Sequence, residues 1–322
     1  MISSFIITLS LIPISILISK KLNILDIPNE RKFHKLPIPK SGGLVILITY
    51  FSLLVSNSQL NLNLLLSTVL MSVLITLDDF LKLNRYLRLC SQAIISLPLV
   101  LNILYFDNSL TSQFILLFLI FLYCSFINLF NFFDGLNTIL SSQFLLAIMY
   151  YYINSNSLGL IENIKDFKIL IGSIIAFLFY NSFGLIFMGD IGSCFIGMFS
   201  ATIFAKTLVN GNFSNSILIL APYIPILSDT SITLLIRIKK KERFFLPHKK
   251  HAYQLLAQMG FSHINVSLFY CLKLIFYTSC IYLINVKTSS LEAMIFASLL
   301  IILFEVYIIK LIRHKAKILN LI

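Results

Sequence analysis

Long apolar segments alternate with short polar ones along almost the whole chain. A helix needs about 20 mostly apolar residues to cross the hydrocarbon core of a bilayer, and shorter segments are tolerated where the bilayer adapts. About eleven segments fit this pattern, at residues 2–19, 42–57, 61–77, 89–106, 111–128, 136–153, 167–187, 192–209, 215–236, 264–284 and 291–311. The pattern predicts an all-α polytopic membrane protein in which residues 1–322 form a single integral membrane domain.

Composition supports this fold class. The 322 residues are 58% hydrophobic and 12% charged, and the mean hydropathy of +0.92 is too high for a soluble domain. The five cysteines lie in or beside apolar segments without CxxC spacing, so we expect free thiols. No basic segment precedes residues 2–19, and Lys20 and Lys21 follow them, which favours a retained first helix over a signal peptide.

The formal net charge of +12 comes from lysines and arginines that lie mostly in the gaps between apolar segments. If the amino terminus lies outside, most of these residues fall in the inner gaps at 20–41, 78–88, 129–135, 188–191, 237–263 and the tail after 312. The outer gaps contain only Lys165, Lys168 and Lys287. The positive-inside rule therefore predicts an outside amino terminus and a cytoplasmic carboxyl terminus. Because membrane orientation accounts for the charge, we expect no nucleic-acid partner.

Three polar side chains follow the fifth apolar segment, in Asn128-Leu-Phe-Asn131-Phe-Phe-Asp134-Gly135. Residues three apart share a helical face, so the three side chains would point the same way if the segment is helical. Polar groups at this depth are costly without a partner, which favours half of a metal or phosphate site. The alternative is a helix end that is capped by its own Asn and Asp and turns at Gly135.

Asp78 and Asp79 are adjacent carboxylates at the end of the third segment, followed by Lys82 and Arg85. Two adjacent like charges raise a pKa or require a cation, which suits a divalent ion or a proton acceptor. The alternative is a solvated helix terminus at the membrane surface. Asp229, inside the ninth segment, is interpreted as paired with Arg237, as facing the cavity, or as a structural hydrogen-bonded acid.

The sequence Gly189-Asp190-Ile-Gly192-Ser193 joins two apolar segments with almost no loop. The glycines allow close backbone approach, and Ser193 can cap the next helix. The amino end of that helix favours an anion, whereas Asp190 favours a metal ion. A tight turn explains the glycines and the serine, but not an aspartate at this depth.

The first inner gap is dense in cations and prolines and ends in Lys40-Ser-Gly42-Gly43. Arg31, His34 and Lys40 can bind phosphate groups, and the lysine beside two glycines at a helix entry favours an anion site. The alternative is a basic patch that holds anionic lipid.

The longest inner gap contains His248 and His251, with two lysines between them. Two histidines three apart share a helical face and could ligate zinc or donate to a diphosphate, and the lysines favour the anion. The alternative is solvated surface, to which we assign His263 and His314.

Together these stretches resemble the polyprenyl-phosphate N-acetylhexosamine-1-phosphate transferases, in the order in which that family carries them. The resemblance spans the chain and rests on Asp26-x-Pro28…Arg31-Lys32…His34, Lys40-x-Gly42-Gly43, Leu77-Asp78-Asp79, Asn128-x-x-Asn131-x-x-Asp134-Gly135, Gly189-Asp190-x-Gly192-Ser193 and the late histidine loop. Any one of these motifs is weak, but six in order are specific.

The resemblance implies a membrane enzyme with a cytoplasmic active site and Mg²⁺ or Mn²⁺ as cofactor. In such enzymes undecaprenyl phosphate attacks the β-phosphorus of a UDP-N-acetylhexosamine, and UMP leaves. The expected partners are therefore the UDP-N-acetyl sugar, undecaprenyl phosphate and the bilayer of the bacterial inner membrane, and a homodimer is allowed. The branch that initiates O-antigen and related polysaccharides is the most similar.

The same resemblance assigns roles to individual residues. It implies that Asp190 and Asn131 hold the metal, and that Asp78 and Asp79 orient or deprotonate the lipid phosphate. The residues expected to stabilise diphosphate charge are Lys40, His248 and His251. The residues expected to bind substrate are Asn128, Asp134, Arg31, His34, Gly192 and Ser193.

Two departures from the family pattern stand out. Many relatives have a second aspartate where this chain has Asn137, so either that carboxylate is not indispensable or an amide replaces it. The sequence from His248 to Gln254 also differs from the compact histidine cluster of the peptidoglycan branch. The sugar stays open among GlcNAc, QuiNAc, FucNAc and similar N-acetyl sugars.

Two other classes of protein compete with this interpretation. A polytopic transporter with an intramembrane acidic site would place its acids near the bilayer midplane, whereas these motifs fall at inner helix ends. A lipid-dependent glycosyltransferase acting outside would need acidic motifs in outer gaps, where Asp107, Glu162 and Asp166 form no such group.

Overall fold

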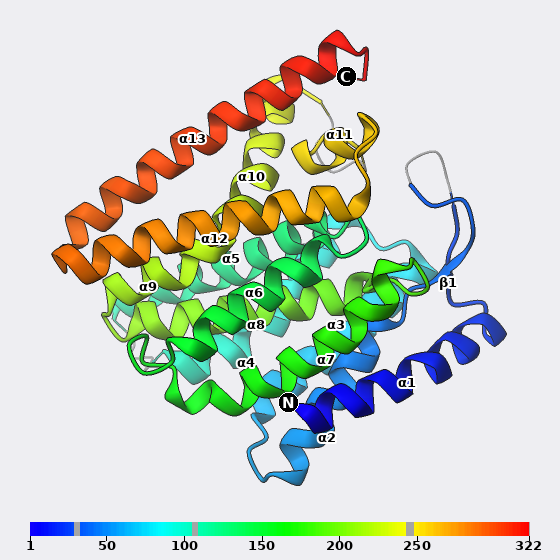
Figure 1. The fold of residues 1–322 in the computed structure, drawn as a ribbon. Coiled ribbons are helices and arrows are strands. Elements are labelled where there is room, and N and C mark those ends of the chain that lie inside the picture. Colours follow the sequence, from blue (N-terminus) through cyan, green and yellow to red (C-terminus); the bar gives the residue numbers. More distant parts are fainter. Residues whose placement is uncertain (29–32, 105–108, 243–247, 322) are drawn as a thin grey trace.

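The computed structural model describes residues 1–28, 33–104, 109–242 and 248–321, and nearly all of its regular structure is helical (Figure 1). The elements are α1 (Ile2–Lys21), β1 (Leu25–Asp26), β2 (Ile38–Pro39), α2 (Gly42–Ser56), α3 (Leu62–Leu81), α4 (Arg85–Ile103), α5 (Leu110–Phe133), α6 (Ile139–Ile153), η1 (Ile161–Asn163), α7 (Ile164–Ser182), α8 (Gly189–Val209), α9 (Phe213–Leu220), η2 (Ala221–Tyr223), α10 (Ile224–Lys239), α11 (Ala252–Gln258), α12 (His263–Thr288) and α13 (Leu291–Ile318). Each predicted apolar segment coincides with helix, with its ends shifted by a few residues.

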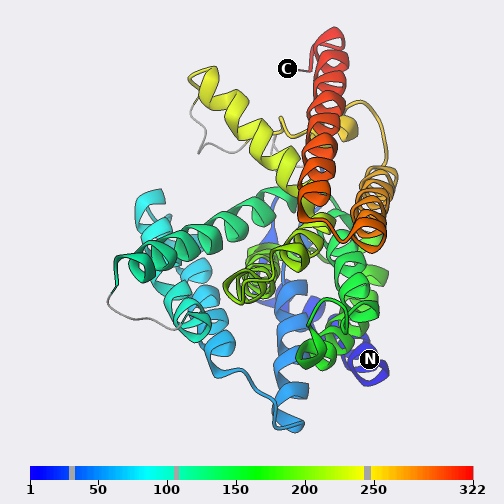
Figure 2. The ribbon, with the colours of Figure 1, turned by 90° about the vertical axis from the view of Figure 1, so that its left-hand side faces the viewer.

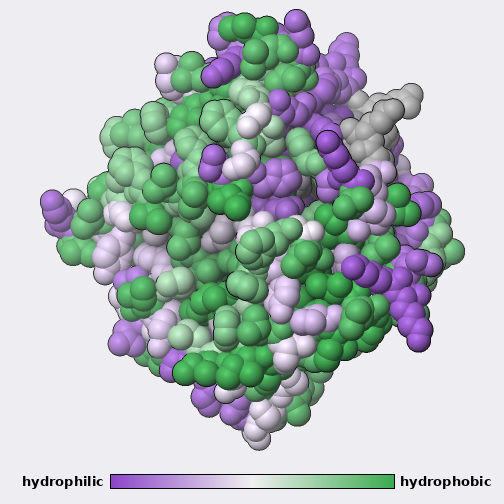
Figure 3. Space-filling view, turned by 45° about the vertical axis from the view of Figure 1, so that its right-hand side comes forward, coloured by the Kyte–Doolittle hydropathy of each residue, from purple (hydrophilic) through white to green (hydrophobic). Residues whose placement is uncertain are grey.

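The helices have the length and surface of membrane spans. Within the described ranges, eight helical segments are long and apolar enough to cross a bilayer, and α2 and α6 are shorter apolar helices of 15 residues each. Many outward side chains are hydrophobic, such as Phe296, Leu303 and Tyr307 on α13. Figure 3 shows hydrophobic residues over much of the lower part of one face, and hydrophilic residues gathered at its upper right. The prediction of an all-α polytopic membrane protein is confirmed.

Helix α8 forms the centre of the bundle. It packs against α5, α2, α3, α4 and α9, and most of its residues are buried. Small residues allow this packing, because a Cβ atom on Gly197 would lie 2.8 Å from the Cα of Ile127, and one on Gly43 would lie 2.3 Å from the Cα of Gly192. The first residues of α8 are therefore held firmly against α2.

The predicted span at 215–236 is broken into α9, η2 and α10. Pro222 and Pro225 lie at the break. Proline has no amide hydrogen to donate and clashes with the preceding turn, so a continuous helix cannot pass through both residues. In Figure 2, α10 turns away from the direction of α9.

Two further differences lie near the inner gaps. Helix α5 continues to Phe133, beyond the predicted end at 128, so Asn128 and Asn131 are helical. The first inner gap contains a two-residue antiparallel ladder, with Leu25 opposite Pro39 and Asp26 opposite Ile38. The ladder joins the two ends of that gap beside the polar end of the bundle, on the right of Figure 1.

Candidate active site

A cavity of about 400 Å³ lies where several helices begin or end. It is lined by Asp26, Phe33, His34, Lys40, Asp79, Asp134, Gly135, Leu136, Asn137, Asn181, Phe187, Met188, Gly189, Asp190, Gln254 and His263. The first five predicted inner gaps all contribute to this lining. Segments far apart in sequence therefore meet at one end of the bundle, as the alternating threading of the chain requires.

The cavity has an excess of acidic side chains. Among the lining residues that the structure describes, the carboxylates belong to Asp26, Asp79, Asp134 and Asp190, and Lys40 supplies the ammonium group. Lys40 forms an ion pair with Asp79, and His34 Nε2 lies 2.9 Å from Asp26 Oδ2. A diphosphate entering this cavity would meet like charge, so these carboxylates suit a site that also binds a cation.

Asp190 lies at the junction of this cavity and a much smaller one behind it. The smaller cavity is lined by Asp78, Asn128 and Asn131, together with Asp190. Asn131 hydrogen-bonds Asp190 and donates to Ser193 Oγ at 3.1 Å. The predicted acidic and amide residues thus gather around Asp190, with Asp79 on the main cavity and Asp78 and Asn131 behind it.

The residues of the smaller cavity have partners of their own. Arg88 Nη1 lies 3.2 Å from Asp78 Oδ2, and Asn128 Nδ2 donates to Gln92 Oε1 at 2.7 Å. These contacts hold the cavity-side ends of α3 and α5 against α4. Asn128 and Asn131, one turn apart on α5, both line the smaller cavity and not the main one.

The first turn of α8 faces the main cavity. Gly189 has a φ of +72°, and a Cβ atom there would lie 2.2 Å from the carbonyl oxygen of Lys40, so only glycine fits. The amino end of α8 favours negative charge at this position. Gly192 and Ser193 lie one turn deeper, where Gly192 packs on Gly43 and Ser193 is buried within the helix rather than capping it.

The entry of α2 offers fewer amides to an anion than its sequence suggests. Gly42 N donates to Phe187 O at 2.9 Å, and Gly43 N donates to Met188 O at 2.8 Å. These backbone donors are already used to join α2 to the segment before α8. The anion-binding capacity predicted for this stretch therefore rests on the Lys40 side chain.

Asp134 and Gly135 form the turn that follows α5, at the edge of the cavity. Burial, with the charge of Asp190, raises the pKa of the Asp134 carboxyl well above its usual value. Tyr253 holds this turn from α11, because its hydroxyl donates to Phe132 O at 2.8 Å. A Cβ atom on Gly135 would lie only 2.3 Å from that hydroxyl oxygen.

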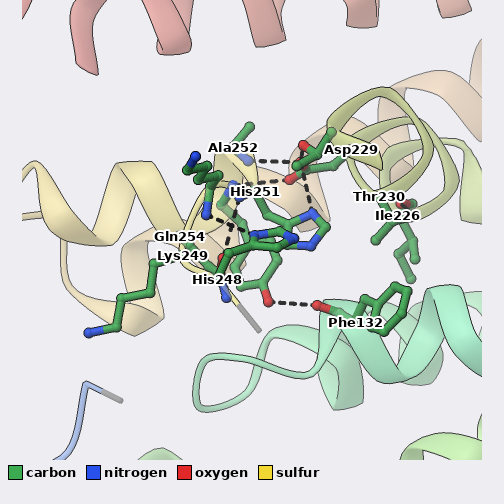
Figure 4. A network of polar contacts seen from close by, with 12 residues as sticks. Phe132, Ile226, Asp229, Thr230, His248, Lys249, His251, Ala252 and Gln254 are labelled. Atoms are coloured by element: carbon green, nitrogen blue, oxygen red, sulfur yellow. Dashed lines mark hydrogen bonds and ion pairs between the residues drawn. The ribbon is translucent and has the colours of Figure 1, made fainter. Parts of the chain in front are cut away.

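Asp229 anchors α11 and answers the alternatives left open for this acid (Figure 4). Its carboxylate accepts Ala252 N at 2.8 Å and Tyr253 N at 3.0 Å, and it also accepts the hydroxyl of Tyr270 at 2.5 Å. It is fully buried and does not line the cavity. Asp229 is therefore a structural acid that holds the amino end of α11.

His248 and His251 do not share a helical face, because α11 begins only at Ala252. Their rings nevertheless lie 4.8 Å apart, and the His251 ring stacks on Tyr253 at 5.7 Å. Burial, with the nearby positive charges, lowers the pKa of His248 to about 3. Neither histidine lines the main cavity, which this segment reaches through Gln254.

His263 was interpreted as solvated surface, and that interpretation is wrong. It lines the cavity, packs edge-on against Phe33, and its Nδ1 accepts Asn137 N at 3.3 Å. The sequence offered no signal, because a single histidine at a helix start resembles any exposed one. His314 is exposed as expected, and Arg31 lies outside the described residues.

The implied metal ion can be tested against the donors in place. Over the described part of the chain, no group of three or more His, Cys, Asp and Glu side chains is arranged to hold a metal ion. Magnesium, however, is often bound through one or two carboxylates, with water and substrate phosphates completing its ligands. Asp190 supplies a carboxylate where the two cavities meet, and Asn131 supplies an amide oxygen from the smaller cavity behind it, so the residues present fit such an ion.

The fold and the cavity define a polytopic helical membrane protein with a carboxylate-rich site at its helix ends. Residues 61–207 match the family described as glycosyl transferase family 4. A probable undecaprenyl-phosphate N-acetylglucosaminyl 1-phosphate transferase of Bacillus subtilis (strain 168) is 28% identical over 318 residues, which cover 94% of this chain and 88% of that protein. A decaprenyl-phosphate N-acetylglucosaminephosphotransferase of Mycobacterium leprae (strain TN) is 24% identical over 299 residues, covering 78% and 74%. These matches support the resemblance, drawn above from the motifs, to the polyprenyl-phosphate hexosamine-1-phosphate transferases.

Proposed function

We propose that this protein transfers an N-acetylhexosamine-1-phosphate from a UDP-sugar to undecaprenyl phosphate, giving undecaprenyl-diphosphate-sugar and UMP. The observation that carries the proposal is the convergence of residues from distant motifs on one cavity, above all Asp79, Asp134 and Asp190 with Lys40. The two curated relatives are named for reactions of this class. Their names also support GlcNAc as the first sugar to test.

The chemistry is a phosphoryl transfer. An oxygen of the lipid phosphate forms a bond to the β-phosphorus of the UDP-sugar, and the bond from that phosphorus to the oxygen bridging to UMP breaks. Such reactions depend mainly on positioning and on neutralising charge around phosphorus. When bound, Mg²⁺ or Mn²⁺ supplies that neutralisation, with Asp190 and Asn131 as the residues that hold it.

The other side chains of the cavity position the two anionic substrates. Lys40 attracts phosphate and, through its ion pair, holds Asp79 beside the site of transfer. Asp79, with Asp78 behind it, orients the lipid phosphate. Asp134 positions the nucleotide sugar. His34 lines the same cavity, and its two ring nitrogens contact Asp26 Oδ2 and Leu36 O, so it holds the loop before Lys40 in place.

The loop that contains His248 and His251 acts without lining the main cavity. His248 and His251 support α11, whose Tyr253 holds the Asp134 turn and whose Gln254 lines the cavity. The proposed substrate-binding set also includes Arg31, Asn128, Gly192 and Ser193. The last two position the first turn of α8.

The cavity faces the cytoplasm in this proposal, and the protein resides in a bacterial inner membrane. The basic residues of the gaps that form the cavity support that orientation. We propose that the product initiates a cell-surface polysaccharide such as O-antigen, and that the protein is able to work as a homodimer.

The test is UMP release by the purified protein with undecaprenyl phosphate, magnesium and a panel of UDP-N-acetyl sugars. Lipid-dependent release that a chelator abolishes is the expected result. The Asp190→Asn variant should lose activity by about a thousandfold or more, since a metal ligand and a central charge are removed. Cys90→Ala, at an exposed thiol, should retain activity. Unchanged activity in folded Asp190→Asn protein would refute the assignment.

A further inference from the structure

Two oppositely charged side chains pair inside the bundle, between the neighbouring helices α12 and α13 (Figure 1). Lys273 of α12 is 6% exposed and Glu305 of α13 is fully buried. Lys273 Nζ lies 2.8 Å from Glu305 Oε1 and 2.9 Å from Oε2. Both helices are long and apolar enough to cross a bilayer. Neither residue lines the main cavity or the smaller one behind it, so neither contacts substrate in the proposed reaction.

Stability alone does not account for this ion pair. Taking two charges out of water costs free energy that their attraction often does not exceed, and well-packed apolar residues in their place are often neutral or stabilising. Helix α13 also packs on α9, α10 and α11, so it does not depend on the pair for its place in the bundle. Ionisable residues within membrane spans favour a functional interpretation.

The ammonium group of Lys273 lies over the ring of Tyr270, which is on the preceding turn of α12. The distance from Nζ to the ring centroid is 4.1 Å, within the range of a cation–π attraction. Lysine is otherwise a flexible side chain, and Glu305 fixes its ammonium group at this position. The ion pair therefore restricts the position of the buried Tyr270 ring.

Tyr270 in turn contacts both segments that hold the Asp134 turn. Its hydroxyl donates to Asp229, which accepts the first amides of α11. Its ring lies 5.3 Å from the ring of Phe133, which also lies 5.0 Å from the ring of Tyr253 on α11. Phe133 is fully buried and directly precedes Asp134. Two tyrosines thus enclose the side chain next to the cavity acid.

We infer that Lys273 and Glu305 are positioning residues, which fix Tyr270 and, through it, the entry of α11 and the Asp134 turn. The inference rests on the proposed function for the reaction that Asp134 serves. It gives two residues outside both cavities a role in placing the nucleotide sugar. Packed side chains and hydrogen bonds can carry such coupling between separate regions, and here they form a continuous series of contacts.

Removing both charges together tests this role without leaving an unpaired buried charge. In Lys273→Met/Glu305→Met the Tm should equal or exceed that of the wild type, because apolar side chains of similar length replace the pair. The kcat/KM for the UDP-sugar should nevertheless fall about tenfold, with the KM for undecaprenyl phosphate unchanged. The matched control is Lys287→Met/Glu292→Met, which removes exposed charges of the same two signs from α12 and α13 and should retain activity.

Exchanging the two charges separates the cation over Tyr270 from the ion pair as such. Lys273→Glu/Glu305→Lys keeps a pair between α12 and α13 but removes the ammonium group from the tyrosine ring. Activity should therefore stay about tenfold below that of the wild type in folded protein. Full activity in this variant would show that the pair only joins the two helices, and would overturn the role through Tyr270.

Hydrogen exchange separates failure of this inference from failure of the proposed reaction. The amides of Ala252 and Tyr253 are bonded to Asp229, so in Lys273→Met/Glu305→Met the peptide covering α11 should exchange about fivefold faster or more. Peptides of α1, which lies apart from these contacts, should exchange as in the wild type.

Unchanged exchange in α11 would overturn the inference, and so would faster exchange with unchanged kcat/KM for the UDP-sugar. Faster exchange in α11, in a protein whose wild type releases no UMP with any sugar, would support the link from the ion pair to α11 and refute the proposed function instead.

Discussion

The acidic side chains at the two ends of the helical bundle have different surroundings. At the cavity end, four carboxylates face a shared space, with Lys40 as the lysine among the described lining residues. At the other end, Glu162 and Asp166 are bound by neighbouring donors. Glu162 Oε2 lies 2.7 Å from Lys206 Nζ, and Asp166 Oδ1 accepts the buried hydroxyl of Tyr50 at 2.8 Å.

This difference shows which polar groups the fold leaves for a ligand. Glu162 and Asp166, at the end opposite the cavity, stabilise connections between segments, because both have nearby hydrogen-bond donors. At the cavity end, Asp134 and Asp190 are placed within range of each other's charge, which costs free energy in the absence of a cation. Sites that accept such a cost are typical of binding and catalysis.

The largest contrast is expected between matched acids at the two ends. Asp134→Ala should lower kcat/KM by about a hundredfold or more, because a group that positions substrate is removed. Asp166→Ala should leave activity within about twofold but lower the Tm, since the buried Tyr50 hydroxyl loses its acceptor at a cost of about 1–3 kcal/mol. Steady-state kinetics and thermal melts of both variants check this, and equal losses of activity would remove the contrast.

A smaller effect is expected at the turn that Tyr253 holds. Gly135→Ala should lower activity by about tenfold, because the new methyl group collides with the Tyr253 hydroxyl and displaces the Asp134 turn. Tyr253→Phe should cost only a few-fold alone, and adding it to Gly135→Ala should recover most of the loss, since the hydroxyl is gone.

Kinetics of the two single variants and the double variant complete this cycle. Asn210→Ala is the control, because Asn210 is exposed in the connection between α8 and α9 and has an ordinary negative φ. Losses that simply multiply in the double variant would show that the hydroxyl and the turn act independently.

The smallest predicted effect is a pH dependence of stability that originates in His248. Folding lowers the pKa of this group from 6.5 to about 3, chiefly by burial, and its Nδ1 accepts Lys250 N at 3.2 Å. The unfolded chain therefore binds a proton that the folded chain does not, so stability falls as the pH decreases below about 6.5.

Thermal melts at pH 7.5 and pH 5.5 measure this effect. The fall in Tm between the two should be smaller in His248→Gln than in the wild type. The exposed His314 provides the control, since His314→Gln should behave as the wild type does. An identical pH dependence in all three proteins would contradict the assignment to His248.

Much of the candidate site was recognisable from local patterns. Asp79, Asp134 and Asp190 stand out because a carboxylate beside a long apolar segment is rare and costly. Helix ends were harder to predict, as shown by α5, which continues through Asn131 to Phe133. The hydrophobic pattern places a helix end where polar residues begin. It contains no information on whether those polar side chains form hydrogen bonds inside the bundle, which allows the helix to continue.

Other features depended on contacts between distant segments. His263 reaches the cavity because α12 begins beside Asn137, and Asp229 is withdrawn from it because α11 presents two amide donors. Neither partner lies near its residue in sequence. No local pattern could distinguish His263, which lines the cavity, from His314, which does not.

The sequence alone determined the membrane class, the apolar helical segments and the motifs that resemble the transferase family, because each depends on composition, spacing or residue order within a short stretch. The tertiary structure decided which polar groups remain available at the cavity and which are used internally, as with the amides of Gly42 and Gly43. It also placed the Lys273–Glu305 pair beside the ring of Tyr270. The physical reason is that these hydrogen bonds and ion pairs form where separate helices meet, and that geometry is fixed only when the whole bundle packs.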